Sequence, residues 1–164
     1  MSHVAESRDA GHGESLNRSA VRATAHCLTG CAIGEVLGMV IATALAWGNS
    51  ASIAISVVLA FVFGYALTLG PILRAGVPLR RAAGLTVASD TISIATMEFI
   101  DNAFLLVVPG AMAAGLSNGL FWWSLALSLA IAFVVTVPVN RWLIARGRGH
   151  AVVHHLHGPL FPRA

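Results

Sequence analysis

Charged residues are scarce in this chain, and lysine is missing. Only 10% of the 164 residues are charged, and all ten basic residues are arginines. A soluble domain carries about a quarter charged residues, so this scarcity argues against that class. Hydrophobic residues make up 57% of the chain, which is typical of a membrane protein.

The signatures of common enzyme classes are missing as well. The sequence contains no phosphate-binding loop, dinucleotide fingerprint, haem-attachment motif or Ser/His/Asp arrangement, so we expect a protein that is not an enzyme. The two cysteines, Cys27 and Cys31, are spaced as C-x-x-x-C and not as the CxxC redox motif. A pair four residues apart on a regular helix is poorly oriented for a disulfide.

Long hydrophobic runs occur four times, at residues 25–47, 53–73, 85–108 and 120–139. Each is close to the ~20 residues that a helix needs to cross the hydrocarbon core. We therefore expect an all-α polytopic membrane protein with four transmembrane helices. The expected organisation is a mobile cytoplasmic tail (1–22), a four-helix transmembrane domain (23–146) and a His-rich cytoplasmic tail (147–164).

The arginines predict the topology. They precede the first run, separate the second from the third, and follow the fourth, whereas residues 48–52 and 111–119 contain none. By the positive-inside rule, both termini and the middle loop are cytoplasmic. Deleting the third run would place several arginines outside, so this run stays a span despite its acids. Anionic lipid headgroups account for the basic excess, and no nucleic-acid partner is expected.

A polar stripe runs along the first span. Cys27, Cys31 and Glu35 are four residues apart, so they drift by only about 40° per step around a helix. His26 lies about 140° away from Cys31 on the same wheel, and it is a secondary candidate for metal capture.

Three glycines form a neighbouring stripe on that helix. Gly30, Gly34 and Gly38 make a doubled GxxxG pattern, which lets another helix approach closely. The partner helix belongs either to the same chain or to a second copy. Because four spans of ~20 residues make a thin bundle, we also expect a homo-oligomer.

The third span also has one polar side. Asp90, Met97 and Asp101 fall within about 40° of one another, and Glu98 lies on the same broad side. Each acid costs about 2.5–3.5 kcal/mol near the middle of a membrane, so these side chains should point into the bundle. The opposite face, with apolar residues such as Phe99, is expected to meet lipid or a neighbouring helix.

The two polar faces should meet at similar depth. Cys31 follows Arg22 by nine residues, and Asp90 follows Arg81 by nine. If both helices begin at the same height, each side chain lies about 13 Å inward from its arginine. We therefore expect Cys31 and Asp90 to face each other.

These side chains suggest a metal site. Thiolates suit Cu(I) and Zn, and carboxylates suit harder divalent ions. One hypothesis is an intramembrane site for a Cu or Zn ion, with ligands drawn from Cys27, Cys31, Glu35, Asp90, Met97, Glu98 and Asp101. The alternative is that the cysteines are small apolar residues of a helix interface and that the acids are hydrogen-bonded.

The C-terminal tail is rich in histidine. His150 and His154 would share a helical face if the fourth helix continued, and they are further candidates for secondary metal capture. The alternative is a solvated segment loosened by its glycines.

Three strings also resemble a known family. HCLTGCAIGE (26–35), SDTISIATMEFIDN (89–102) and PVNRWLIARGRGHA (138–151) resemble a bacterial membrane family, domain of unknown function 4396. The resemblance covers about residues 20–158. It implies a four-span, multi-pass domain in the bacterial cytoplasmic (inner) membrane and supplies no activity or site residue.

Three function classes follow. The first is binding or transport of a transition metal between the first and third spans. The second is a proton-coupled exporter of small cations, which would resemble the small multidrug resistance proteins in having four spans and a glutamate on the first. The third is a noncatalytic scaffold or accessory subunit, in which the glycine stripe and polar patches only hold partner helices together.

Overall fold

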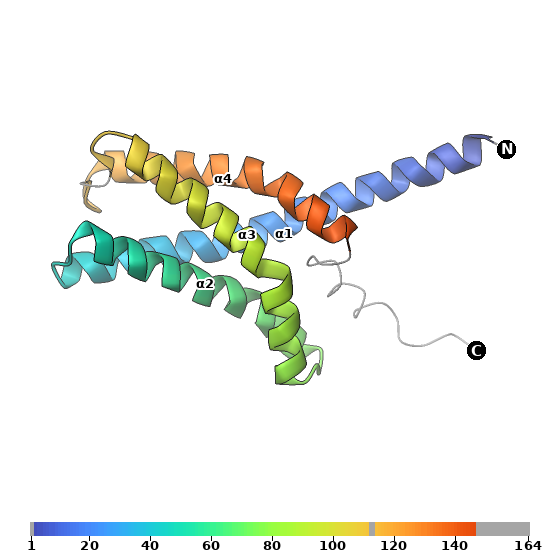
Figure 1. Cartoon of the computed structure of the whole chain (residues 1–164), viewed down its shortest axis with the longest axis horizontal. Helices are drawn as coiled ribbons and strands as arrows, with labels where there is room; N and C mark the ends of the chain where they lie inside the picture. The colour runs from blue at the N-terminus through green and yellow to red at the C-terminus, as the bar shows by residue number, and fades with distance from the viewer. Residues whose placement is uncertain (1, 112–113, 147–164) are drawn as a thin grey trace.

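The part of the chain that the structure describes forms four α-helices arranged as two hairpins. The structure is a computed structural model that describes the backbone of residues 2–111 and 114–146 and the side chains from residue 15 onward. The helices are α1 (Ser2–Ala44), α2 (Asn49–Arg74), α3 (Leu79–Val107) and α4 (Gly119–Ala145). In Figure 1, α1 lies beside α2 and α3 beside α4, and the loops after α1 and α3 share one end, here named the hairpin end.

Three helical stretches are long and apolar enough to cross a membrane. They are Ser15–Ala44, Asn49–Arg74 and Gly119–Ala145. The 29 residues of α3 are also long enough, since a helix rises 1.5 Å per residue. Composition sets α3 apart, because its arginines and acids lower its hydropathy. The expected all-α, multi-pass architecture is therefore present, with three helices recognisable as spans from composition alone.

The first helix is longer than the sequence suggested. Low apolar content predicted a mobile cytoplasmic tail for residues 1–22. The backbone of α1 is helical from Ser2, and the mobility of this segment stays a prediction. Figure 1 shows its first turns projecting beyond the other helices. Once a helix is nucleated in a stable span, each further residue adds a hydrogen bond at little cost, so the helix can propagate outward without tertiary contacts.

Large apolar side chains lie outside and polar ones inside. Phe99, Val107 and Trp123 are 77%, 80% and 74% exposed, whereas Asp90 and Asp101 are 1% and 2% exposed. A soluble protein buries its apolar residues and leaves such acids in water. The reverse pattern is expected in lipid, where a carboxyl group must be covered by protein. The prediction that Phe99 lies opposite the polar face of α3 is confirmed.

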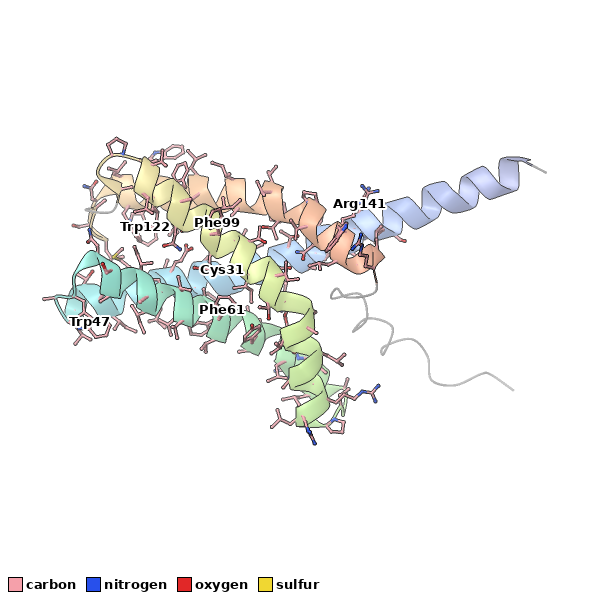
Figure 2. All side chains as sticks on the ribbon, viewed as in Figure 1. Cys31, Trp47, Phe61, Phe99, Trp122 and Arg141 are labelled. Carbon is pink, nitrogen blue, oxygen red and sulfur yellow. The ribbon has the colours of Figure 1, made fainter. Side chains whose placement is uncertain are left out.

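Aromatic residues mark both ends of the bundle. Figure 2 shows Trp47 and Trp122 at the hairpin end and Arg141 at the opposite end, here named the arginine end. At the arginine end the Arg146 guanidinium carbon lies 4.1 Å from the centroid of the Trp142 ring. Tryptophans at both limits of an apolar bundle are the pattern expected at two membrane–water interfaces.

The glycine stripe of α1 is a seam with α2. Each glycine meets a small residue of α2: Gly30 meets Gly64, Gly34 meets Ala60 and Gly38 meets Ser56. A Cβ built at Gly30 would lie 2.6 Å from the Gly64 Cα, and one at Gly34 would overlap the Ala60 backbone. The stripe is therefore used within the chain. A homo-oligomer stays a prediction, and its interface would have to use another face.

We predict that Gly34→Ala destabilises the fold by about 1–3 kcal/mol, because the added methyl overpacks the seam and pushes α2 from α1. Gly70→Ala is the matched control, since a Cβ at Gly70 meets nothing within 4 Å. The measurement is the melting temperature of each variant in detergent, followed by fluorescence-detected size exclusion. Equal melting temperatures for the two variants would contradict the close α1–α2 contact.

Candidate functional site

The polar stripe of α1 is buried. Cys27, Cys31 and Glu35 are 2%, 0% and 8% exposed. The glycine stripe beside them is closed by α2, and their own face turns toward α3 and α4. The four-residue spacing therefore places two thiols and a carboxyl group along a single buried face of one helix.

The polar face of α3 is buried against this stripe. Asp90, Met97, Glu98 and Asp101 are between 1% and 5% exposed. Ser89 donates a hydrogen bond of 2.7 Å to Asp90 Oδ1. The third helix is therefore central to the bundle, as the cost of its acids predicted.

The two faces meet as three pairs, here named the rungs. Cys27 lies near Asp90, Cys31 lies near Glu98, and the carboxyl group of Glu35 lies near that of Asp101. One rung follows another along the helices, with two residues in each.

The expected pairing of Cys31 with Asp90 was wrong by one turn of α1. Cys27 takes the place opposite Asp90. The depth argument assumed that both helices begin at the same height. In Figure 1 the first turns of α3 instead lean away from the bundle axis, so α3 enters the bundle later than a straight helix would.

The Glu35–Asp101 rung is the most polar of the three. Ser128 of α4 lies near Asp101, whereas the carboxyl oxygens of Glu35 have no hydrogen-bond partner in the described residues. Two carboxylates in contact repel each other unless a proton or another cation lies between them. This rung is therefore the position in the bundle with the strongest demand for a positive charge.

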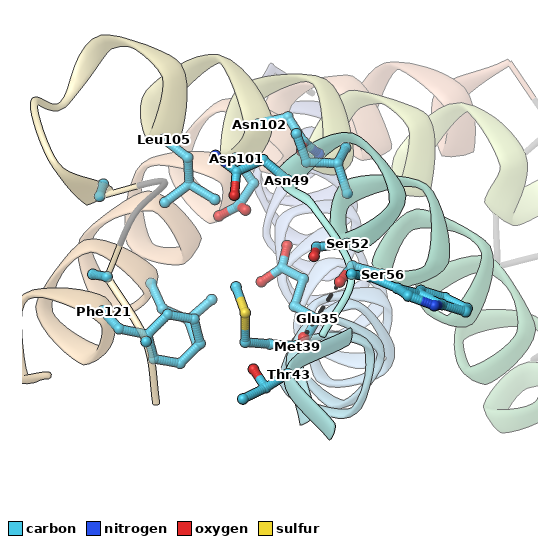
Figure 3. A pocket seen from close by; sticks show the side chains of 16 residues that line it. Glu35, Met39, Thr43, Asn49, Ser52, Ser56, Asp101, Asn102, Leu105 and Phe121 are labelled. Atoms are coloured by element: carbon cyan, nitrogen blue, oxygen red, sulfur yellow. Dashed lines mark hydrogen bonds between the residues drawn. The ribbon is translucent and has the colours of Figure 1, made fainter. Parts of the chain in front are cut away.

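A cavity of about 190 Å³ opens above this rung toward the hairpin end. Figure 3 shows the carboxyl groups of Glu35 and Asp101 pointing into it. Apolar and polar side chains share its walls: Met39, Trp47, Leu105 and Phe121, with Asn49, Ser52, Ser56 and Asn102. The two acids thus form the floor of a chamber whose mouth lies between the loops after α1 and α3.

A polar stripe on α4 was missed by the sequence analysis. Ser124, Ser128, Thr136 and Asn140 are all buried, at multiples of four residues along the helix. Asn140 donates a hydrogen bond of 2.8 Å to Thr24 Oγ1 of α1 and accepts one from Ser93 of α3. The spacing alone was the available signal, because four small polar residues in an apolar run differ little in composition from ordinary membrane helices.

The predicted metal ligands do not form one site. In the described residues, no group of three or more His, Cys, Asp and Glu side chains is placed to hold a metal ion. The acids and cysteines of the predicted set lie in pairs at successive depths, which spreads the ligands along the helix axis. The metal-ligand roles of the seven residues stay a prediction.

The cysteines also fit the alternative interpretation, in which they are small apolar residues of a helix interface. Both are free, and they pack with Ile94 and Met97 in the hydrophobic core cluster. His26 is half-buried on α1, one residue before Cys27. His150 and His154 lie outside the described residues, so the predicted capture of metal by the tail stays a prediction.

A family model described as Domain of unknown function (DUF4396) matches residues 16–149. The chain belongs to this family. No curated protein and no solved structure matches it significantly. The match in this DUF4396 protein includes all three rungs, the cavity and the polar stripe of α4. The three quoted strings had predicted this family from the sequence.

We predict that both native thiols resist a water-soluble maleimide in the folded protein, because their side chains are 2% and 0% exposed, and react after denaturation in SDS. The control is a Thr43→Cys variant without the native cysteines, since Thr43 is exposed at the cavity wall and should react in the folded state. Mass spectrometry counts the modified thiols. Native cysteines that react as fast as the Thr43→Cys thiol would contradict the burial of the rungs.

Proposed function

We propose that this DUF4396 protein is a noncatalytic, proton-coupled carrier of small cations in the cytoplasmic (inner) membrane of a bacterium. The observation that supports it most directly is the contact between the Glu35 and Asp101 carboxyl groups at the floor of an open cavity. Paired acids that face water on one side form a site where a proton and a cation compete.

The proposal includes four membrane crossings with both termini cytoplasmic. The arginines favour this orientation, because they are absent from the loops at the hairpin end. The burial of its acids supports α3 as the fourth crossing, since its outer face carries exposed Ile92 and Phe99. In this orientation the cavity opens to the outside of the cell.

The exchange needs only the two acids and the cation. With no cation bound, one carboxyl group is protonated and donates a hydrogen bond to the other, which is a carboxylate, so the rung carries a single negative charge. A monovalent cation that enters between the oxygens displaces this proton, which leaves through the water of the cavity. The cation and the proton cannot both neutralise the same oxygen, so each weakens the binding of the other.

The cavity fits an organic cation better than a bare metal ion. A chamber of about 150 Å³ can hold benzene, so 190 Å³ accommodates a small alkylammonium. The rings of Trp47 and Phe121 can attract its positive charge, and the two carboxyl groups neutralise it. A divalent transition metal usually needs more ligand atoms from strong donors than this rung supplies.

We predict that tetramethylammonium binds the wild-type protein and that Glu35→Gln weakens this binding by about tenfold or more, because one of the two acids is lost. Affinity should rise from about pH 6 to about pH 8, since protons compete with the cation. Isothermal titration calorimetry in lipid nanodiscs measures both effects.

The matched control is Glu98→Gln. Glu98 is also a buried glutamate and lies near Glu35 and Asp101, but it does not line the cavity. Its replacement should weaken tetramethylammonium binding much less than Glu35→Gln does, because both acids that line the cavity remain. Equal affinity in wild type and Glu35→Gln, or an affinity independent of pH, would overturn the carrier. Tight co-purification of one membrane partner in place of cation binding would favour the scaffold function.

A second candidate function is the binding or transport of a transition metal, Cu or Zn. One observation favours Cu(I): the two cysteines share a buried cluster with the Met97 thioether. Thiolate and thioether sulfur are the ligands that Cu(I) prefers, and it accepts fewer ligands than Zn. A sulfur site of this kind would lie deeper than the cavity floor, at the Cys27 and Cys31 rungs.

We predict for this second function that protein purified without a histidine tag retains copper after exposure to Cu(I), and that Cys27→Ser plus Cys31→Ser retains little. Met97→Leu should lower the copper content, whereas Met39→Leu, which changes a methionine of the cavity wall, should not. Elemental analysis provides the measurement. Equal copper in wild type and the double-serine variant would end the thiol-site hypothesis.

A further inference from the structure

The polar face of α4 extends from the cavity floor toward the arginine end. Ser128 reaches Asp101 at the floor, and Thr136 and Asn140 follow on the same buried face. Cys27 and Cys31 of α1 lie at intermediate depth along this face. A cation that leaves the Glu35–Asp101 rung toward the arginine end would therefore meet polar side chains of α4 on its way.

This polar face ends at a point where three helices are tied together. Asn140 of α4 donates to Thr24 of α1 and accepts from Ser93 of α3. The exposed fractions of these three side chains are 4%, 0% and 1%. The Thr24 hydroxyl in turn donates to the Ala20 carbonyl at 2.8 Å. The side-chain amide thus joins α1, α3 and α4 through one hydrogen bond to each neighbour.

The two ends of the bundle therefore differ. Toward the hairpin end, the cavity extends along α1 from Trp47 to Glu35. Thr24 lies eleven residues before Glu35, which is about 16 Å along a helix. At that depth the side-chain hydrogen bonds of Asn140 join α4 to α1 and α3.

We propose that Asn140 is a latch that closes the arginine end of the cation path, so that the structure represents the state that loads from the cavity. Release of the cation at the arginine end requires both side-chain bonds of Asn140 to break. The existence of a cation path rests on the proposed function, but the closure of this end can be tested without any cation.

The accessibility of the Cys27 thiol can be used to measure whether this end is closed. Cys27 follows Thr24 by three residues, so the two lie almost one turn apart on α1, and the chain has only one other cysteine. In a Cys31→Ser background, a membrane-impermeant methanethiosulfonate is added to proteoliposomes of known orientation. The rate of Cys27 modification from each side is read by mass spectrometry.

Two variants break the latch in different ways. Asn140→Leu keeps the side-chain volume and removes both bonds, while Thr24→Val plus Ser93→Ala removes both partners and keeps the amide. Each should raise the rate of Cys27 modification from the arginine end about tenfold or more, because the open state becomes more populated. The rate from the hairpin end should not change.

Thr136→Val is the matched control. Thr136 is as buried as Asn140 and lies one turn away on the same face, but its hydroxyl has no hydrogen-bond partner in the described residues. This variant should leave the rate unchanged. A variant that does not fold is recognised by size exclusion, and the other latch variant then gives the same test.

Unchanged modification in both latch variants would overturn the latch, and so would an equal acceleration in Thr136→Val. Faster modification in the latch variants without any tetramethylammonium binding would support the latch and contradict the carrier. Binding with no acceleration would support the carrier and remove Asn140 as its gate.

Discussion

A carboxyl group inside a lipid bilayer has to be covered by protein, and this constraint determines the arrangement of the helices. Glu35, Asp90, Glu98 and Asp101 would each cost about 2.5–3.5 kcal/mol near the centre of a membrane, or on the order of 10 kcal/mol together. That sum is comparable to the stability of a whole protein domain. The acids are instead between 1% and 8% exposed, because α3 lies with its polar face against α1 and α4.

The close contact between α1 and α2 makes this arrangement possible. Gly30 and Gly34 let α2 approach until small residues such as Ala60 touch the α1 backbone. Because α2 packs closely on the glycine face of α1, the neighbouring face of α1 stays available for contact with α3. A bulkier residue at Gly34 would push α2 outward and shift Glu35, the next residue, and Cys31, which lies three residues earlier. The glycine stripe therefore positions the site without forming part of it.

Much of this architecture can be predicted from local sequence patterns. The four-residue spacing of Cys27, Cys31 and Glu35 was sufficient to predict a buried stripe, and three acids on one side of α3 were sufficient to predict its partner. The register between the helices was not predictable, because it depends on where α3 enters the bundle, which is a tertiary property. Asn140 was missed for a related reason. The role of a single amide in an apolar helix depends on its hydrogen-bond partners, and those of Asn140, Thr24 and Ser93, lie on other helices.

The same contacts must serve both stability and movement. In lipid, helices gain no hydrophobic driving force from meeting each other, so close packing and hydrogen bonds between helices hold the bundle together. The α1–α2 seam depends on the packing of small residues, and Ser56 is the polar residue among those that meet its glycines. The contacts of α4 with α1 and α3 include the hydrogen bonds of Asn140 to Thr24 and Ser93, which a cation would have to replace or break. This division suggests a rigid α1–α2 pair against which α3 and α4 rearrange, because only on the polar side can water or a cation substitute for the bonds that are lost.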